Sequence, residues 1–314
     1  MKKSILIIIM VFVPLLSMAQ AAGGTISRPA VPSKQKVIKR SGKSSKTKTV
    51  VPNKDISTRE RKSGTVLTHS ESHSATIMQK SQTPVTKKEI PPIIQNLIGN
   101  MVFVEGGIHT MPASNDTTNS IDNLSRKVSL SSFFIGKFEV TQEEWIAIMI
   151  TNPSVYLHLG NKIPVHNVSW EDCQEFVKRL NSLTGMHFRL PTAAEWEYAA
   201  GGGKNTRNYK FSGGNNLSNV AWISMNSNHK IHTVGEKTPN ELGLYDMSGN
   251  VKEWCQEKID NKQIESLRWT PGNSCIVRGG SFLSGADECI ITNRKYVPSQ
   301  THDVALGFRL VLEK

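Results

Sequence analysis

The first 96 residues contain no tryptophan and no tyrosine, although the 314-residue chain has six tryptophans and five tyrosines. Residues 20–96 lack phenylalanine as well and are rich in Lys, Ser, Thr, Val and Pro. Such a segment cannot bury enough apolar surface to offset the conformational entropy lost on ordering. We therefore expect residues 20–96 to be a disordered basic linker and residues 97–314 to form one folded domain of ordinary size.

Acidic residues are also scarce at this end of the chain. Residues 1–96 hold 4 Asp and Glu against 17 Lys and Arg, whereas the rest holds 22 against 21, so the net charge of +12 belongs to the leader. No part of the leader alternates basic with aromatic residues, which excludes a base-stacking nucleic-acid site. The basic cluster 34–48 could touch anionic lipid, a cell-wall polymer or nucleic acid, but a solvated linker is the simpler interpretation.

The chain has no apolar run long enough for a membrane span, which needs about 20 residues. Met1–Ala19 instead has the pattern of a signal peptide, with Lys2 and Lys3 before the apolar run Ile5–Leu16 and small residues at 17 and 19. The alternative is a retained N-terminal anchor. We expect an exported protein, periplasmic, cell-surface or secreted, with no transmembrane segment after cleavage.

Cysteine is rare, and no two cysteines stand in a CxxC pair, so neither a zinc ribbon nor a thioredoxin motif is indicated. In an exported protein the four cysteines could pair in three ways, and their spacing does not choose among them: Cys173, Cys255, Cys275 and Cys289. A GxSxG nucleophile elbow and a phosphate-binding glycine loop are also absent.

Three helices have readable starts, at the N-caps Thr141, Ser169 and Thr192. A glutamate three residues after the first and the third cap completes a capping box. Glycines at 185 and 201 follow the second and third helices, where a helix commonly ends.

Short β-prone runs are spread along the chain rather than gathered in one part. They are Met101–Val104, Phe133–Val140, Ile231–Val234, Gly243–Met247, Cys275–Arg278 and Leu306–Leu312. After Gly203, roughly 110 residues show little other regularity, which is uncommon unless metal ions, disulfides or hydrogen-bonded side chains fix the chain. The sequence therefore predicts an α+β domain with little regular secondary structure.

The segment Gly243–Trp254 could bind a cation. Asp246 and Glu253 flank a turn at Gly249-Asn250, so both carboxylates and the carbonyls between them can point to one place. Calcium prefers such oxygen ligands. The alternative is that Asp246 and Asn250 satisfy the backbone of the turn and that Glu253 is a surface charge.

Four motifs occur in order along residues 100–314: Arg189–Ala200, Gly243–Trp254, Arg278–Phe282 and Leu306–Arg309. Together they resemble the formylglycine-generating enzyme family, also called the sulfatase-modifying-factor domain. The resemblance implies a variant of the C-type lectin fold with few helices and strands.

The resemblance also implies structural Ca²⁺. The positions that match the family's ligands are Asp246 and Glu253 through their side chains and Gly249 and Val251 through their carbonyls. A second family calcium site would start at Asn219-Val220, but residues 224–232 supply no clear acidic ligand for it.

Enzymes of this family oxidise a sulfatase cysteine to formylglycine with O₂ and copper, which two thiolates hold. Ser281 matches the family's active-site serine and Cys289 its second cysteine, but Ser284 stands where the first cysteine would be. Lys252 stands where the family usually has tryptophan. Because one thiol of the pair is missing, we expect no copper.

These observations favour an exported, non-oxidase binding or assembly module whose partner is a protein or a component of the cell envelope. The alternative is an active formylglycine-generating oxidase, which would need Cys275 or Cys255 to replace the missing thiol in space. An oxidoreductase using non-haem iron is a third hypothesis, ranked last because the family branches of that kind place histidine ligands on a further domain that this chain lacks.

Overall fold

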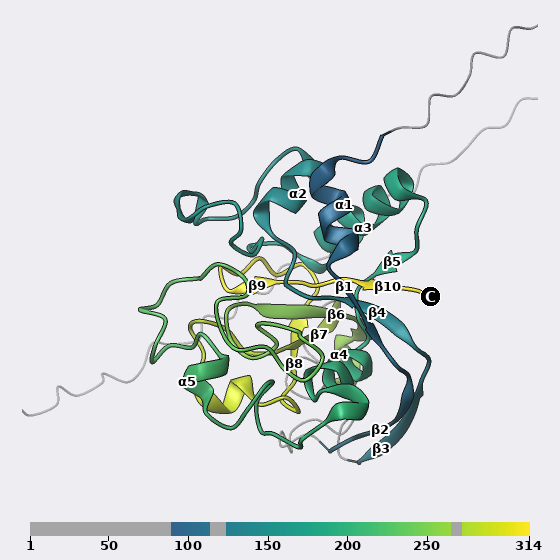
Figure 1. The fold of residues 1–314 in the computed structure, drawn as a ribbon, viewed down its shortest axis with the longest axis vertical. Coiled ribbons are helices and arrows are strands. Elements are labelled where there is room, and N and C mark those ends of the chain that lie inside the picture. Colours follow the sequence, from purple (N-terminus) through teal and green to yellow (C-terminus); the bar gives the residue numbers. More distant parts are fainter. Residues whose placement is uncertain (1–88, 114–123, 265–271) are drawn as a thin grey trace, which may run out of the picture. The chain divides into compact units, whose positions relative to one another are not determined.

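A computed structural model describes residues 89–113, 124–264 and 272–314 (Figure 1). The predicted signal peptide, and all of the predicted linker except its last residues, lie outside the described residues. The helices are α1 (Pro92–Gly99), α2 (Gln142–Met149), α3 (Trp170–Thr184), α4 (Ala193–Ala200) and α5 (Leu217–Val220). The strands are β1 (Met101–Val104), β2 (Gly107–Met111), β3 (Arg126–Leu130), β4 (Phe133–Gly136), β5 (Phe188–Arg189), β6 (Lys252–Asp260), β7 (Asn273–Arg278), β8 (Lys295–Pro298), β9 (Leu306–Gly307) and β10 (Val311–Leu312).

The described strands form three small sheets, ordered β1-β4-β10-β5, β2-β3 and β8-β7-β6-β9. Their pairings are antiparallel except for the short parallel contact between β6 and β9. Long coil segments connect them, and the α+β class with little regular structure is confirmed. No helix of the described residues is both long and apolar enough to cross a bilayer.

The three predicted helix starts are confirmed. Thr141, Ser169 and Thr192 each accept the backbone N–H of the acid three residues later, whose side chain bonds back to the cap. Gly185 ends α3 in the left-handed conformation at φ 70°. Local hydrogen bonding therefore fixes where these helices begin, as the sequence indicates.

The strand predictions have mixed outcomes. Met101–Val104 is β1, and Cys275–Arg278 lies within β7, while Leu306–Leu312 divides into β9 and β10. Ile231–Val234 and Gly243–Met247 are not strands. In the second segment Asp246 has φ 58°, a left-handed value that a strand residue does not adopt.

The predicted domain boundary at residue 97 falls inside α1. Ile94 and Leu97 of this helix are buried in the same hydrophobic cluster as α3. The folded domain therefore begins before residue 92. The composition of residues 20–96 hides this short helix, because it contributes only a few apolar residues.

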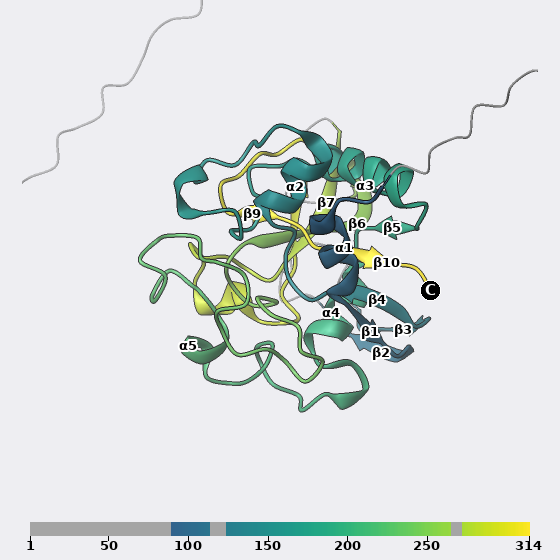
Figure 2. The same cartoon turned by 45° about the horizontal axis from the view of Figure 1, so that its top comes forward.

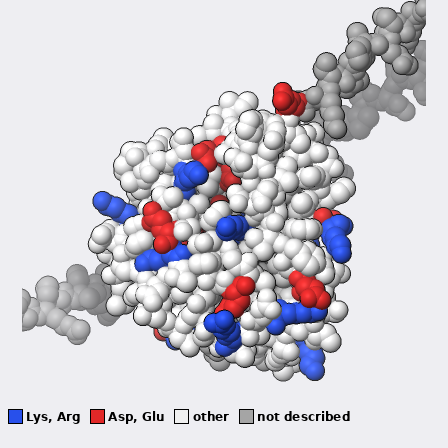
Figure 3. All heavy atoms as spheres, in the orientation of Figure 1, with Lys and Arg blue, Asp and Glu red and all other residues white. Residues whose placement is uncertain are grey.

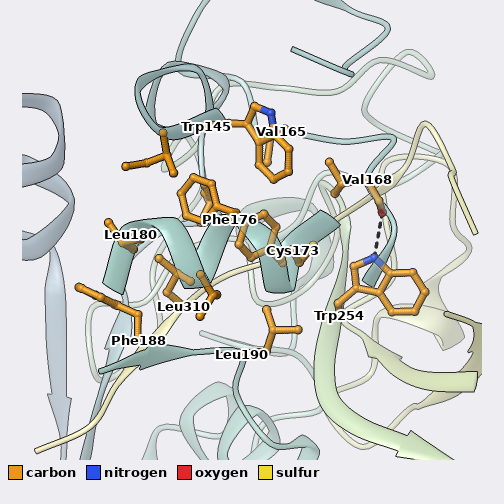
Figure 4. Packing of buried hydrophobic residues seen from close by; sticks show 14 of the residues in the cluster. Trp145, Val165, Val168, Cys173, Phe176, Leu180, Phe188, Leu190, Trp254 and Leu310 are labelled. Carbon is orange, nitrogen blue, oxygen red and sulfur yellow. Dashed lines mark hydrogen bonds between the residues drawn. The ribbon is translucent and has the colours of Figure 1, made fainter. Parts of the chain in front are cut away.

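The core has two main clusters that together hold β6. Trp145 of α2 stacks on Phe176 of α3, with ring centroids 5.3 Å apart, and the indole N–H of Trp254 donates to the Val168 carbonyl at 3.0 Å (Figure 4). On the other side, Trp196 and Cys255 belong to the second cluster, which surrounds α4. Because β6 lies between these clusters, its backbone fixes the direction of the side chains that form the candidate site.

Candidate functional site

Glu253 of β6 is wholly buried and paired with Arg309. The Arg309 Nε and Nη2 atoms each donate to a Glu253 carboxylate oxygen at 2.7 Å, which is a bidentate ion pair. Trp196 of α4 donates its indole N–H to the same carboxylate, also at 2.7 Å. The interpretation of Glu253 as a surface charge is therefore wrong, because neither member of the pair is exposed.

Asp246 and Glu139 lie in the same buried pocket. Asp246 accepts the Gly235 N–H through Oδ2 at 2.7 Å, while its Oδ1 is buried and has no hydrogen-bond partner. Burial raises the pKa of Asp246 to about 6. The hydrogen bond from Gly235 and the charge of Arg309 oppose this rise, whereas the charge of Glu253 adds to it. Burial, and then Asp246 and Glu253, hold the pKa of Glu139 well above its usual range.

Glu139 also organises the turn of the predicted cation motif. Its carboxylate accepts the Asn250 side-chain amide at 2.8 Å and the Val251 N–H at 3.0 Å. Gly249 packs against Trp222 so closely that a Cβ would lie 2.3 Å from the Trp222 carbonyl oxygen, and its φ is 84°. Only glycine fits there.

This pocket fits a small dication in two respects. Three buried carboxylates, those of Glu139, Asp246 and Glu253, share the one guanidinium of Arg309. The Oδ1 atom of Asp246 has no hydrogen-bond partner. Glu253 is the exception, since both of its oxygens already accept hydrogen bonds. Within the described ranges no three His, Cys, Asp or Glu side chains converge on a metal position. This does not test the predicted site, because the motif supplies only two such side chains and its other ligands are the carbonyls of Gly249 and Val251. Calcium at Asp246 stays a prediction.

The Asn219-Val220 position fits a cation less well. The Asn219 carbonyl accepts the Thr238 N–H at 3.0 Å, and the Lys237 ammonium donates to the Ser218 carbonyl at 2.7 Å. The same ammonium lies 3.7 Å from the centre of the Trp222 ring. A lysine therefore supplies the positive charge at this position and would repel a dication.

Ser281 and Ser284 lie side by side in the structure. Their hydroxyl oxygens are 3.2 Å apart, and the Ser284 hydroxyl donates to Glu288 Oε2 at 2.5 Å. Burial alone would raise the pKa of Glu288, but the bonds from Lys295 and Ser284 outweigh it and lower that pKa. Ser284 is thus a donor to a carboxylate, a role that the thiol expected at this position would fill poorly.

Cys289 does not face this pair of serines with a reactive thiolate. It is buried in a cluster with Phe211 and Ile223, and burial raises the pKa of its thiol to about 12. Behind it, a Cβ added to Gly280 would lie 2.5 Å from the Cys289 sulfur, so the thiol is closely packed. At neutral pH the group is a protonated thiol, which is neither a good nucleophile nor a good metal ligand.

The other cysteines do not replace the missing thiol. All four are free and buried. Cys173 and Cys275 lie in the cluster around α3, whereas Cys255 lies in the cluster around α4. None of the disulfides that an exported chain could form is present. An active oxidase would need Cys255 or Cys275 to replace the missing thiol, and neither lies at Ser284.

Charged side chains lie at and around Lys252, the position where the family usually has a tryptophan. The Lys252 ammonium pairs with Asp303 at 2.8 Å, and Lys295 pairs with Glu288 at 2.5 Å. The surroundings of Ser284 are therefore paired ionic groups.

Sequence reasoning missed the roles of Glu139, Arg309 and Glu288. Glu139 follows the apolar run that begins at Phe133, and an acid at the end of such a run is a weak signal for burial. Arg309 lies in one of the four recognised motifs, and an arginine among buried apolar residues could have suggested a buried acidic partner.

Comparisons with known proteins agree with this geometry. The model of the sulfatase-modifying factor enzyme 1-like domain matches residues 86–314. The chain is 32% identical to the chaperone protein LppX of Paenibacillus barcinonensis, over 62% of this chain and 82% of that protein. It is 34% identical to a formylglycine-generating enzyme of Thermomonospora curvata, over 44% of this chain but only 50% of that enzyme.

Among solved structures, Treponema denticola variable protein 1 is similar over 68% of this chain and 95% of its own, with 31% identity and a TM-score of 0.58. PvdO from Pseudomonas aeruginosa shares the fold with a TM-score of 0.55, at 20% identity, 68% coverage of this chain and 94% of its own. The motifs, the fold and the match over most of its length agree: the chain belongs to the sulfatase-modifying factor enzyme 1-like domain family.

Proposed function

We propose that this protein is an exported binding or assembly module of its family and that it does not generate formylglycine. The observation that carries the proposal is the state of the two thiol positions. Ser284 donates to Glu288, and Cys289 is a buried thiol whose pKa burial raises to about 12. Two soft thiolates that could share Cu(I) are therefore not assembled.

The similarity to a protein named as a chaperone supports a binding role, since that relative covers more of this chain than the formylglycine-generating enzyme does. The paired ionic groups beside Ser284 are also consistent with a scaffold. They leave Lys252 and Glu288 neutralised by partners within the chain. The partner we propose is a protein or a component of the cell envelope.

A Cu(I) competition titration tests this proposal. The full chain is titrated against a chromophoric Cu(I) chelator, beside a Cys289→Ala variant and an active formylglycine-generating enzyme. We expect the enzyme to take copper from the chelator and the chain and its variant to take none. Copper uptake by the chain that Cys289→Ala abolishes would overturn the proposal.

A further inference from the structure

One side of the domain carries an uncharged loop with exposed aliphatic side chains. The segment 145–161, from α2 through the following loop, contains no Lys, Arg, Asp or Glu. Three of its aliphatic residues are more than half exposed: Ile150, Val155 and Leu157. Figures 1 and 2 show this loop projecting from the body of the domain in both views. Exposed aliphatic side chains that gather on one uncharged loop make it a candidate interaction site.

A second loop brings more apolar surface to the same side. Met225 is 86% exposed, and Leu283 is 46% exposed. Ser224, next to Met225, bonds the Ser284 carbonyl through its N–H and its hydroxyl. Tyr156 contacts Phe282, with ring centroids 6.2 Å apart, so the first loop adjoins the same segment. We call Ile150, Val155, Leu157, Met225 and Leu283 the apolar rim.

The backbone under the rim is held by a buried histidine. His166 Nε2 accepts the N–H groups of Val155 and Tyr156 at 3.0 and 3.2 Å, and its Nδ1 bonds the Pro164 carbonyl at 3.0 Å. The Asn167 amide also donates to the Pro153 carbonyl at 3.0 Å. The exposed side chains therefore stand on an ordered support, which lowers the entropy that binding would cost.

Ile150 is difficult to explain by folding alone. Its φ is 72°, a value at which a β-branched residue is strained, and its side chain is 83% exposed. Neither backbone preference nor burial stabilises isoleucine there, and with ψ at −34° the conformation is one that only glycine adopts readily. The apolar side chain gains free energy only if something covers it.

The charges near the rim are suited to an anionic surface. Lys162 and Lys230 are exposed, and the Val234 N–H bonds the Lys162 carbonyl at 3.1 Å, which joins the two loops. Glu236 of the second loop is paired with His232 at 3.4 Å. On the face drawn in Figure 3, basic and acidic side chains are interspersed. The basic leader adds positive charge to the same chain.

We propose that the apolar rim docks on a lipid bilayer that carries anionic headgroups. Aliphatic tips on projecting loops enter the headgroup region, and lysines beside them contact lipid phosphates. This goes beyond the proposed function by naming one surface and its partner, and the copper titration can fail without affecting it.

Vesicle binding by labelled full-length chains tests the proposal. Because the four native cysteines are buried, an environment-sensitive dye can be placed on Met225→Cys, with the also highly exposed Ile108→Cys of β2 as the control. Vesicles of phosphatidylcholine and phosphatidylglycerol in equal amounts should shift the emission of the dye at 225 to the blue and leave the dye at 108 unchanged. Binding through the leader alone would move neither dye and would overturn the proposal, as would an equal shift at both positions.

A polar substitution at Ile150 gives a second readout. Ile150→Asn replaces an exposed aliphatic side chain of the rim with a polar one and should weaken vesicle partitioning by roughly tenfold. Ile108→Asn should leave partitioning unchanged. Unchanged partitioning of Ile150→Asn would overturn the proposal and leave a protein partner as the occupant of the rim.

Discussion

The pocket around Glu253 and the segment from Ser281 to Cys289 are neighbours in the fold but have very different chemistry. In the first, a buried bidentate ion pair, an indole N–H and two further carboxylates form one network. In the second, a serine bonds a half-exposed glutamate and the thiol is packed away. The comparison teaches that one region of this chain is a buried charge network, whereas the other lacks the pair of thiols that the family resemblance associates with oxidation.

The ion pair should have the largest effect when broken. Glu253→Ala removes the bidentate partner of Arg309 in the core, so we expect the free energy of unfolding to fall by about 3–5 kcal/mol. Urea unfolding measures this change. Glu175→Ala, which removes the partner of an exposed pair on α3, is the matched control and should leave the free energy of unfolding almost unchanged. Equal losses in the two variants would remove the distinction between the regions.

Calcium tests whether the first pocket also holds a dication. If Asp246 Oδ1 is a ligand, excess Ca²⁺ should raise the melting temperature relative to a chelator, by a stabilisation of about 2.7 kcal/mol at a hundredfold excess over Kd. Asp246→Asn should remove the difference. A melting temperature that is the same with Ca²⁺ and with chelator would contradict the calcium prediction but not the ion pair.

A smaller effect is expected in the second region. Ser284→Ala removes one hydrogen bond to Glu288, which keeps its ion pair with Lys295 and its contact with solvent. We expect a loss of about 0.5–1.5 kcal/mol in the free energy of unfolding. Urea unfolding again provides the measurement, and a loss as large as that of Glu253→Ala would show that Ser284 belongs to the structural framework.

The sequence predicts best what local chemistry determines. Thr141, Ser169 and Thr192 fix helix starts because the cap and its acid are only three residues apart. The family resemblance supplies the fold class.

Long-range pairings could not be predicted. Glu253 and Arg309 are 56 residues apart in the sequence, and Glu139 and Val251 are 112 residues apart. No local sequence pattern therefore indicates either contact. The same holds for Ile231–Val234, whose β-prone residues find no ladder partner in the described structure. The burial of Cys289 depends on Phe211 and Ile223, which spacing does not reveal.

The most direct test of the central claim is turnover of a peptide. The full chain is incubated with Cu(I), O₂ and a peptide of the form Cys-x-Pro-x-Arg, beside an active formylglycine-generating enzyme, and the peptide is weighed by mass spectrometry. The account predicts an unchanged peptide with this chain and a formylglycine aldehyde with the enzyme. Conversion of the cysteine to formylglycine by this chain would contradict it.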